Sequence, residues 1–239
     1  MNYLRIEGWE EERIVHGFGT KGQPGDKITR QEWRGSEVIL REEHFPLISL
    51  KQVHGDGIRI FQGPAQKISD LWEKEGDAIL TPTPRVAIGV FTADCLPLLL
   101  FEPEKRIVAV VHAGWRGTAQ EVVRKIIEKM IDGFDCCREK IKAALGPCIG
   151  PCCYEVDEPV EQTFRRNGLP WDFFSSPRGP GKWLLGLQKA NSFILEKAGV
   201  NKKNINLIKY CTACRTDLFF SYRKEKGTRG RQVNFIALP

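Results

Sequence analysis

Residues 107–130 read IVAVVHAGWRGTAQEVVRKIIEKM, a stretch that joins a predicted strand to a predicted helix. The apolar run at residues 107–111 has the length and composition of a buried strand. From residue 118 to residue 130 the apolar side chains recur at helical spacing, and Gly133 follows as a stop signal. Between the two, His112 enters a glycine-containing turn that also carries Arg116. The stretch therefore predicts a strand, a turn and an amphipathic helix in succession.

Six further apolar runs predict buried strands. They cover residues 78–80, 86–91, 98–101, 143–145, 205–208 and 233–238. Two more helices are expected at residues 157–166 and 184–198. Loops are expected at residues 17–31 and 171–182, because glycine, proline or serine residues cluster there. Strands dominate the first half of the chain and helices the middle, which predicts a mixed α/β or α+β fold. No linker divides the chain, so we expect a single domain over residues 1–239.

The composition and charge narrow the class of function. Apolar residues make up 41% and charged residues 28% of the chain, which excludes a disordered or fibrous protein. No stretch approaches the ~20 apolar residues of a membrane span and no signal peptide opens the sequence, so a cytoplasmic protein is expected. The net charge of +6 suits an anionic small substrate. Because the charges are spread along the chain, we expect no nucleic-acid or membrane partner, and a monomer or small homo-oligomer.

Three residues with metal-binding side chains come at the ends of predicted strands. His54 lies in the sequence KQVHG, Cys95 follows the strand at residues 86–91, and His112 ends the strand described above. Strand ends are where a sheet presents its site residues. One thiolate and two imidazoles suit a tetrahedral zinc ion with a vacant fourth position, the pattern of a catalytic zinc. The alternative is a buried thiol and two hydrogen-bonded histidines.

Arg116 and the basic C-terminal segment are candidates for binding an anion. Arg116 stands where the helix begins, and backbone N–H groups and a guanidinium there could hold phosphate or carboxylate. The alternative is a plain turn with Arg116 in solvent. Tyr222, Arg223 and Arg231 combine aromatic and cationic side chains that could stack a base and clamp a phosphate. A solvated basic hairpin is the alternative for the other cations of this segment.

The remaining cysteines form two groups. Cys136 and Cys137 follow the first predicted helix, and we expect a surface pair without a role. Cys211 and Cys214 form a C-x-x-C, and with the cysteines of residues 148–153 they would allow a second, structural zinc. A single C-x-x-C is a modest signal, so we favour packing thiols beside the cleft.

Seven segments together resemble one known family. They are KQVHG (51–55), GDA (76–78), TADC (92–95), VHAGWRG (111–117), LGP (145–147), CYEV (153–156) and FSYR (220–223). This set is similar to the YfiH/laccase-domain family, described both as multicopper polyphenol oxidase-like and as purine nucleoside phosphorylase-like. The resemblance covers nearly the whole chain. It implies a layered single-domain fold, a sandwich of mixed β-sheets flanked by helices.

The resemblance also implies a metal and a reaction. The metal is zinc, with copper as the other possibility, and its ligands are His54, Cys95 and His112. The reaction is phosphorolysis of adenosine, inosine, guanosine and methylthioadenosine, with adenosine deamination at the same site. Purine nucleosides and phosphate would be the partners.

Within that function, roles can be assigned to individual residues. Cys95 is catalytic through the metal, and Arg116 would place phosphate and neutralise its charge. Asp77 or Asp94 would transfer protons, and the sequence does not separate them. Substrate binding is assigned to four further residues, namely Gln52, Tyr222, Arg223 and Arg231.

Two other enzyme classes compete with this hypothesis. A metal-independent hydrolase would use Cys95 as nucleophile and His112 as base. A copper-dependent polyphenol oxidase fits the residues poorly, because the chain has only four histidines, too few for a trinuclear copper centre. Its two methionines also lie away from the motifs.

Overall fold

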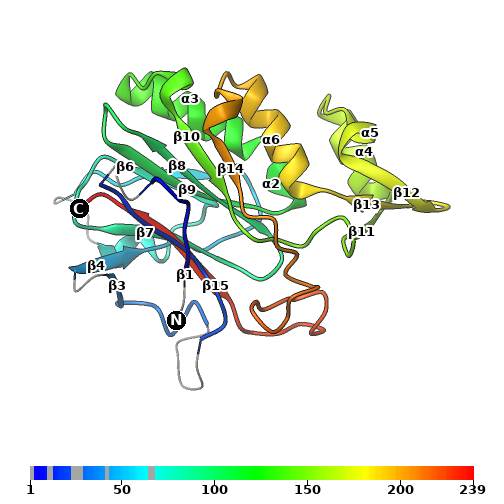
Figure 1. Ribbon diagram of the computed structural model, residues 1–239, viewed down its shortest axis with the longest axis horizontal. Helices are drawn as coiled ribbons and strands as arrows, with labels where there is room; N and C mark the ends of the chain where they lie inside the picture. Colours follow the sequence, from blue (N-terminus) through cyan, green and yellow to red (C-terminus); the bar gives the residue numbers. More distant parts are fainter. Residues whose placement is uncertain (1–2, 10–12, 23–28, 41–42, 64–67) are drawn as a thin grey trace.

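The computed structural model describes residues 3–9, 13–22, 29–40, 43–63 and 68–239. Within these ranges the strands form two six-stranded sheets and one three-stranded sheet. The two large sheets share a core, and helices cover the other face of the second one (Figure 1). This is a mixed α+β arrangement, as the sequence predicts.

The first large sheet places the C-terminal strand in its interior. Its strands are, in spatial order, β1 (Tyr3–Leu4), β2 (Val15–Gly19), β15 (Gln232–Ala237), β7 (Ala87–Thr92), β4 (Glu43–Ile48) and β3 (Glu37–Leu40). The β4–β7 pair is parallel and the other pairs are antiparallel. Strand β15, from the end of the chain, thus lies between β2, from its beginning, and β7, from its middle.

The second large sheet carries the most apolar strands. In spatial order they are β14 (Ile205–Leu207), β10 (Lys142–Leu145), β8 (Leu96–Glu102), β9 (Ile107–Ala113), β6 (Ala78–Thr81) and β5 (Ile58–Ile60). The two outermost pairs are parallel and the inner pairs antiparallel. Strands β8 and β9 are buried along their whole length, because both faces of this sheet are covered.

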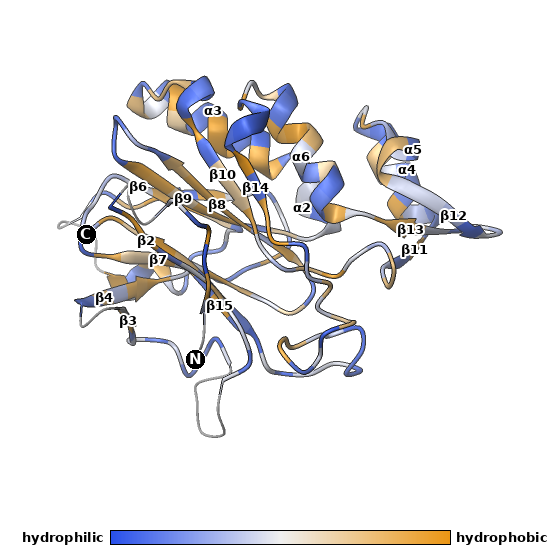
Figure 2. Ribbon diagram, in the orientation of Figure 1, coloured by the Kyte–Doolittle hydropathy of each residue, from blue (hydrophilic) through white to orange (hydrophobic). Residues whose placement is uncertain are grey.

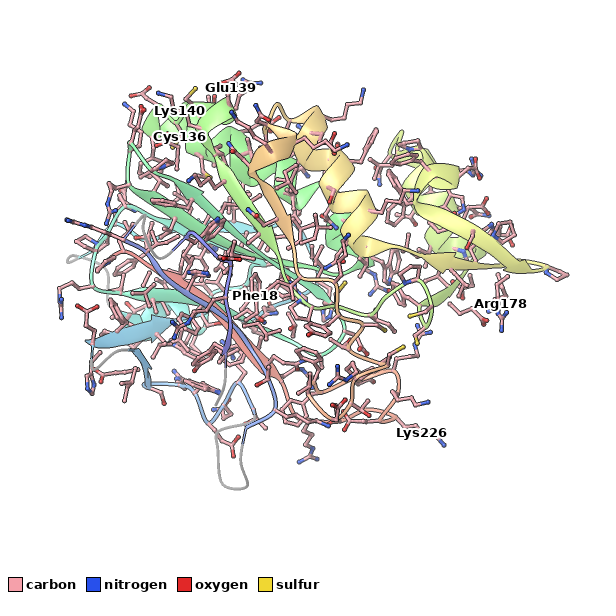
Figure 3. All side chains as sticks on the ribbon, in the orientation of Figure 1. Phe18, Cys136, Glu139, Lys140, Arg178 and Lys226 are labelled. Carbon is pink, nitrogen blue, oxygen red and sulfur yellow. The ribbon has the colours of Figure 1, made fainter. Side chains whose placement is uncertain are left out.

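Alternate residues of the second sheet face two different cores, as the two-residue period of a strand requires. Leu99 faces the first sheet and shares a core with Ile88 and with Phe18, which is labelled in Figure 3. Leu98 and Val111 belong to the core beneath the helices. Figure 2 shows apolar residues concentrated on these strands.

Three helices cover the outer face of the second sheet, namely α2 (Trp115–Ala119), α3 (Val122–Phe134) and α6 (Leu187–Lys197). The single helix predicted for residues 118–130 is wrong, because a break at Glu121, with φ of 54°, separates α2 from α3. The predicted stop at Gly133 is also wrong, since α3 continues to Phe134. A glycine inside a helix costs about 1 kcal/mol, less than the burial of the apolar face of α3 contributes.

A smaller unit of helices and a three-stranded sheet lies at one edge of the molecule (Figure 1). It consists of β11 (Glu155–Asp157), β13 (Lys182–Leu185), β12 (Ser175–Gly179), α4 (Glu158–Arg166) and α5 (Trp171–Phe174). The loop predicted for residues 171–182 is therefore wrong. Trp171 is fully buried and anchors α5, and the polar strand β12 forms by pairing with β13.

The remaining sequence predictions have mixed outcomes. All seven predicted strands are present, and the helix predicted for residues 157–166 is α4. The helix predicted for residues 184–198 is α6, which begins only at Leu187, because residues 184 and 185 belong to β13. In the predicted loop at residues 17–31, residues 17–19 belong to β2 and residues 23–28 lie outside the described residues. The short elements α1 (Ile68–Leu71), η1 (Arg138–Lys140) and η2 (Lys202–Asn204) complete the fold.

Cys136 corrects the prediction of a surface cysteine pair. Its side chain is 3% exposed and packs in the core between the helices and the second sheet. It lies just beyond the end of α3, near Glu139 and Lys140 (Figure 3). Cys137 is half-buried and donates to Glu139 at 3.0 Å. Among the described residues, no helix combines the length and the apolar composition that a membrane span needs.

Candidate active site

His54, Cys95 and His112 come from three separate segments and meet at one place. Their ligand atoms all lie within 4.8 Å of one another. The two imidazole rings are nearly perpendicular, at 81°, with centroids 4.8 Å apart. His112 is buried, Cys95 is half-buried and His54 is exposed, so the group opens toward solvent on the His54 side. The structure thus brings together the three side chains that the sequence singles out as metal ligands.

Each of the three side chains is presented by a constrained piece of backbone. His112 lies near the end of β9, and its N–H donates to the carbonyl of Asp77 at 2.7 Å. Cys95 lies in the turn from β7 to β8, directly after Asp94, which has φ of 93°. His54 itself has φ of 61°. Left-handed backbone at non-glycine residues is uncommon and concentrates at functional sites.

The carboxylate of Asp77 contacts both histidines of this group. Its carboxylate is fully buried and lies 2.7 Å from Nδ1 of His112. It also accepts backbone hydrogen bonds from His54 at 3.0 Å and from Gly55 at 2.7 Å. Because Nδ1 of His112 is engaged by the carboxylate, Nε2 is its free nitrogen. Asp77 therefore positions both histidines.

The electrostatic surroundings favour the thiolate form of Cys95 and the protonated form of His112. Burial opposes ionisation of Cys95, but the charges and hydrogen bonds of His112 and His54 outweigh it and lower the pKa of the thiol to about 6. Burial likewise opposes protonation of His112, whereas Cys95 and Asp77 together raise its pKa to about 9. Without a metal, a thiolate–imidazolium pair is the expected state at neutral pH.

Two glycines of the VHAGWRG segment make room for the group. A Cβ atom on Gly114 would lie 3.0 Å from Sγ of Cys95 and 3.4 Å from Cδ2 of His54. A Cβ atom on Gly117 would lie 2.9 Å from the carbonyl oxygen of Gly55. Larger residues at either position would push the ligand-bearing segments apart.

The group lies in a cavity of about 660 Å³. Besides the three candidate ligands, the cavity is lined by five cationic residues, namely Arg30, Lys51, Arg116, Arg223 and Arg231. Aromatic walls come from Phe91, Trp115, Tyr154 and Tyr222. Cations and aromatic rings together suit a ligand with a negative group and a flat ring.

Three of the five cations form no ion pair with a described carboxylate. Across the described ranges, no carboxylate lies within ion-pair distance of Arg116, Arg223 or Arg231. Arg116 stacks on Trp115, with its guanidinium carbon 4.6 Å from the ring centroid. Arg231 donates to two backbone carbonyls at 2.8 Å, and Arg223 donates to the carbonyl of Glu155 at 2.9 Å. Their guanidinium groups are thus held in place while their charge stays available.

Four other residues predicted for the site have distinct surroundings. Gln52 lines the cavity, but its amide bonds both the N–H and the carbonyl of Phe91 at 2.8 Å. Asp77 is not among the cavity-lining residues, whereas Asp94 is. The Asp94 carboxylate accepts from the Thr212 hydroxyl at 2.6 Å and from a backbone N–H at 2.7 Å. Tyr222 lines the cavity with its side chain largely exposed.

Sequence reasoning missed several lining residues. Arg30 falls in the predicted loop at residues 17–31 and is fixed by bonds to the carbonyls of Leu50 and Trp72. No local pattern distinguishes this arginine from a solvent-exposed one. Tyr154 stands in the CYEV segment, and its ring lies 5.3 Å from the guanidinium carbon of Arg223. The family resemblance includes that segment and could have identified Tyr154.

The donor set suits a single metal ion rather than a multicopper centre. A thiolate and two imidazoles, one of them held by a buried carboxylate, can hold one zinc or one copper ion. The two other histidines are committed elsewhere: His16 accepts from the N–H of Ile6 at 2.9 Å, and His44 pairs with Glu37 at 2.8 Å. They are therefore not available to a copper cluster at this cavity.

Comparisons with known proteins agree with the fold and the motifs. The chain is 36% identical over 165 residues to the purine nucleoside phosphorylase YlmD of Geobacillus stearothermophilus, covering 67% of this chain and 59% of that protein. It is 38% identical over 192 residues to a purine nucleoside phosphorylase of Deinococcus radiodurans, covering 80% of this chain and 69% of that protein. The sequence match thus spans about three fifths of the YlmD protein's length.

The structure of this chain is also similar to that of a solved relative. The crystal structure of YlmD from Geobacillus stearothermophilus has a TM-score of 0.84 and 28% identity, and the match covers all of this chain and 96% of that one. This likeness confirms the expected mixed α+β fold. The family model described as multi-copper polyphenol oxidoreductase laccase matches residues 25–239. The chain therefore belongs to the multi-copper polyphenol oxidoreductase laccase family.

Proposed function

We propose that this chain is a zinc-dependent purine nucleoside phosphorylase that also deaminates adenosine. The observation that carries the proposal is the convergence of His54, Cys95 and His112 in a cationic cavity. Relatives that match most of the chain are named purine nucleoside phosphorylases, which supports the same reaction. Adenosine, inosine, guanosine and methylthioadenosine are the proposed substrates.

Each of the three candidate ligands would bind the zinc ion in a different way. Cys95 is already disposed to ionise, because the two histidines lower its pKa. Asp77 keeps Nδ1 of His112 occupied, so the ring offers Nε2. When bound, zinc would supply a Lewis acid that polarises an oxygen or lowers the pKa of water. His54, the most exposed of the three, lies on the side from which a substrate would approach.

The free arginines would bind the phosphate. Phosphorolysis requires a phosphate oxygen to approach C1′ of the ribose while the purine leaves from the same carbon. Arg116, Arg223 and Arg231 line the cavity without carboxylate partners among the described residues, so they can neutralise a phosphate. Holding it in line with the breaking bond would lower the entropic part of the barrier.

Asp94 is the carboxylate that would exchange a proton with bound substrate. It lines the cavity, whereas Asp77 lies beneath the histidines and acts as a positioning residue. A purine leaving group gains a proton as the bond to ribose breaks, and deamination needs a proton on the departing amine. Tyr222 and Tyr154 flank the same space and would stack on the purine ring.

The proposal is tested by release of free base from a panel of nucleosides, with and without phosphate, and by the zinc content of the same sample. Base and ribose 1-phosphate should form together and only with phosphate. Adenosine should also give inosine without phosphate. Release of base that ignores phosphate would contradict phosphorolysis, and the absence of inosine would contradict deamination.

A second candidate is a metal-independent cysteine hydrolase. The thiolate–imidazolium pair of Cys95 and His112 favours it, because such a pair is an activated nucleophile. Activity that persists in chelator-treated protein and disappears after alkylation of Cys95 would support it. Activity that returns only with added zinc would exclude it.

A further inference from the structure

A second group of sulfur atoms lies outside the candidate active site. The Sγ atoms of Cys152, Cys153, Cys211 and Cys214 all lie within 4.8 Å of one another. Sγ of Cys214 is 3.6 Å from that of Cys152 and 3.4 Å from that of Cys153. Four sulfurs placed tetrahedrally about 2.3 Å from an ion are about 3.8 Å apart. The group therefore has nearly the dimensions of a four-cysteine metal site.

The sheet topology explains why these sulfurs meet. Strands β10 and β14 are parallel neighbours, with Leu145 beside Leu207, so the chain leaves both at the same end of the sheet. Two backbone hydrogen bonds then join the following segments: the N–H of Thr212 donates to Cys148 at 3.0 Å, and that of Cys148 donates to Tyr210 at 3.4 Å. The main chain thus holds the two cysteine-bearing loops together.

Gly150 allows the first loop to close on the sulfurs. Its N–H donates to Sγ of Cys211 at 3.2 Å, a contact that stabilises a thiolate. A Cβ atom at this position would lie 3.3 Å from Sγ of Cys152 and 3.5 Å from Sγ of Cys211. The backbone is therefore packed directly against the cluster and donates to it, as in sites where the sulfur is a ligand.

All four cysteines are free thiols, and Cys152 and Cys214 are exposed, so an ion can reach them. A tetrahedral set of four thiolates without a vacant position is the pattern of a structural zinc. We propose that Cys152, Cys153, Cys211 and Cys214 bind a second, structural zinc ion. This replaces the expectation from the sequence that these cysteines are packing thiols.

Such an ion would hold together the two loops that contact Asp94 at the edge of the cavity. The first loop supplies Ile149 and Tyr154 to the cavity, and the N–H of Ile149 donates to the carbonyl of Asp94 at 2.9 Å. The second loop supplies Thr212, whose hydroxyl bonds the carboxylate of Asp94 at 2.6 Å. Fastening the two loops to each other would fix Asp94 from both sides.

The test counts zinc in the full chain, loaded with zinc under reducing conditions and then desalted. The wild type should retain two ions per chain, and Cys95→Ser, which keeps all four sulfurs, should retain one. The double variant Cys211→Ser/Cys214→Ser should also retain one. Cys137→Ser is the matched control, because it removes a thiol from neither group, and it should retain two.

The decisive readout is zinc X-ray absorption on Cys95→Ser, which does not depend on whether the double variant folds. A shell of four sulfurs at about 2.3 Å is expected. Loss of all zinc from this variant, nitrogen in the shell, or an iron–sulfur cluster in place of zinc would overturn the proposal. So would a disulfide among the four cysteines in the reduced protein. None of these readouts uses nucleoside turnover, and a four-sulfur shell in Cys95→Ser would be seen whether or not the His54–Cys95–His112 group binds zinc in the wild type.

Discussion

Nδ1 of His112 lies 2.7 Å from Oδ1 of Asp77, and both side chains are almost completely buried. A buried carboxylate that holds one nitrogen of an imidazole fixes which nitrogen is free to bind a metal. Asp77 also fastens the loop that carries His54. The relationship therefore links two of the three candidate ligands through one side chain.

Replacing this carboxylate by an amide should weaken the metal site. Asp77→Asn keeps the shape but removes the charge that stabilises His112, and loss of such a contact typically lowers metal affinity about 10–100-fold. A competition titration against a chromophoric zinc chelator measures the change. Asp132→Asn, an exposed carboxylate on α3, is the matched control and should bind zinc like the wild type. Equal affinities in all three proteins would contradict the role given to Asp77.

A methyl group on Gly114 should disturb the site without unfolding the chain. Its Cβ atom would lie 3.0 Å from Sγ of Cys95, so the thiolate has to move. Gly114→Ala should weaken zinc binding about tenfold or more, a change of ~1.4 kcal/mol. The control is Gly133→Ala, whose Cβ meets no atom within 4 Å. It should keep zinc affinity and stabilise helix α3 by up to about 1 kcal/mol. Unchanged zinc affinity in Gly114→Ala would show that the ligands lie farther from this turn.

Removal of Arg116 should act on phosphate rather than on the nucleoside. A hydrogen bond to a charged group contributes about 1.5–3 kcal/mol, so Arg116→Ala should raise the KM for phosphate about 10–100-fold. The KM for inosine should change much less. Arg178→Ala is the control, because Arg178 lies at the far tip of the β12 strand (Figure 3). If the two variants gave the same KM for phosphate, Arg116 would not be a phosphate ligand.

In metal-free protein, iodoacetamide should alkylate Cys95 faster than it alkylates the buried thiol of Cys136. With a pKa of about 6 the Cys95 thiol is mostly thiolate at pH 7, and its labelling by iodoacetamide should slow as the pH falls below 6. Cys136 should stay unlabelled, because burial raises its pKa to about 12. Bound zinc should protect Cys95. Peptide mass spectrometry measures the labelling, and rapid labelling of Cys95 in the zinc-loaded protein would contradict the ligand assignment.

Strands β6, β8, β9 and β10 of the second sheet could be predicted because burial on both faces leaves a plain apolar run, whereas the partly exposed edge strand β5 is not predicted. Strand β9 is such a run, and its prediction from residues 107–111 is confirmed. Strand β12 has the sequence SSPRG, which carries no periodic signal. It forms only because β13 supplies a partner, and that pairing is a property of the tertiary structure.

Cys95 and His112 could be predicted from their positions at strand ends, whereas His54 lies in the loop between β4 and β5 and is identified by the KQVHG segment. Six residues predicted around them do line the cavity, namely Gln52, Asp94, Arg116, Tyr222, Arg223 and Arg231, but other contacts of the site could not be predicted. Asp77 is a candidate proton carrier through the GDA segment, but its contact with His112 depends on β6 lying beside β9 and could not be predicted. Arg30 reaches the cavity from a segment without a local signal. The four-cysteine cluster depends on β10 and β14 being parallel neighbours, and strand order cannot be recovered from apolar runs alone.

The most direct measurement compares wild type and Cys95→Ala for phosphate-dependent release of hypoxanthine from inosine, with zinc determined on the same samples. The wild type should turn over, and the variant should lose one zinc per chain together with phosphorolysis. Full phosphorolysis by Cys95→Ala would contradict the claim that this thiolate and the two histidines hold the ion on which the reaction depends.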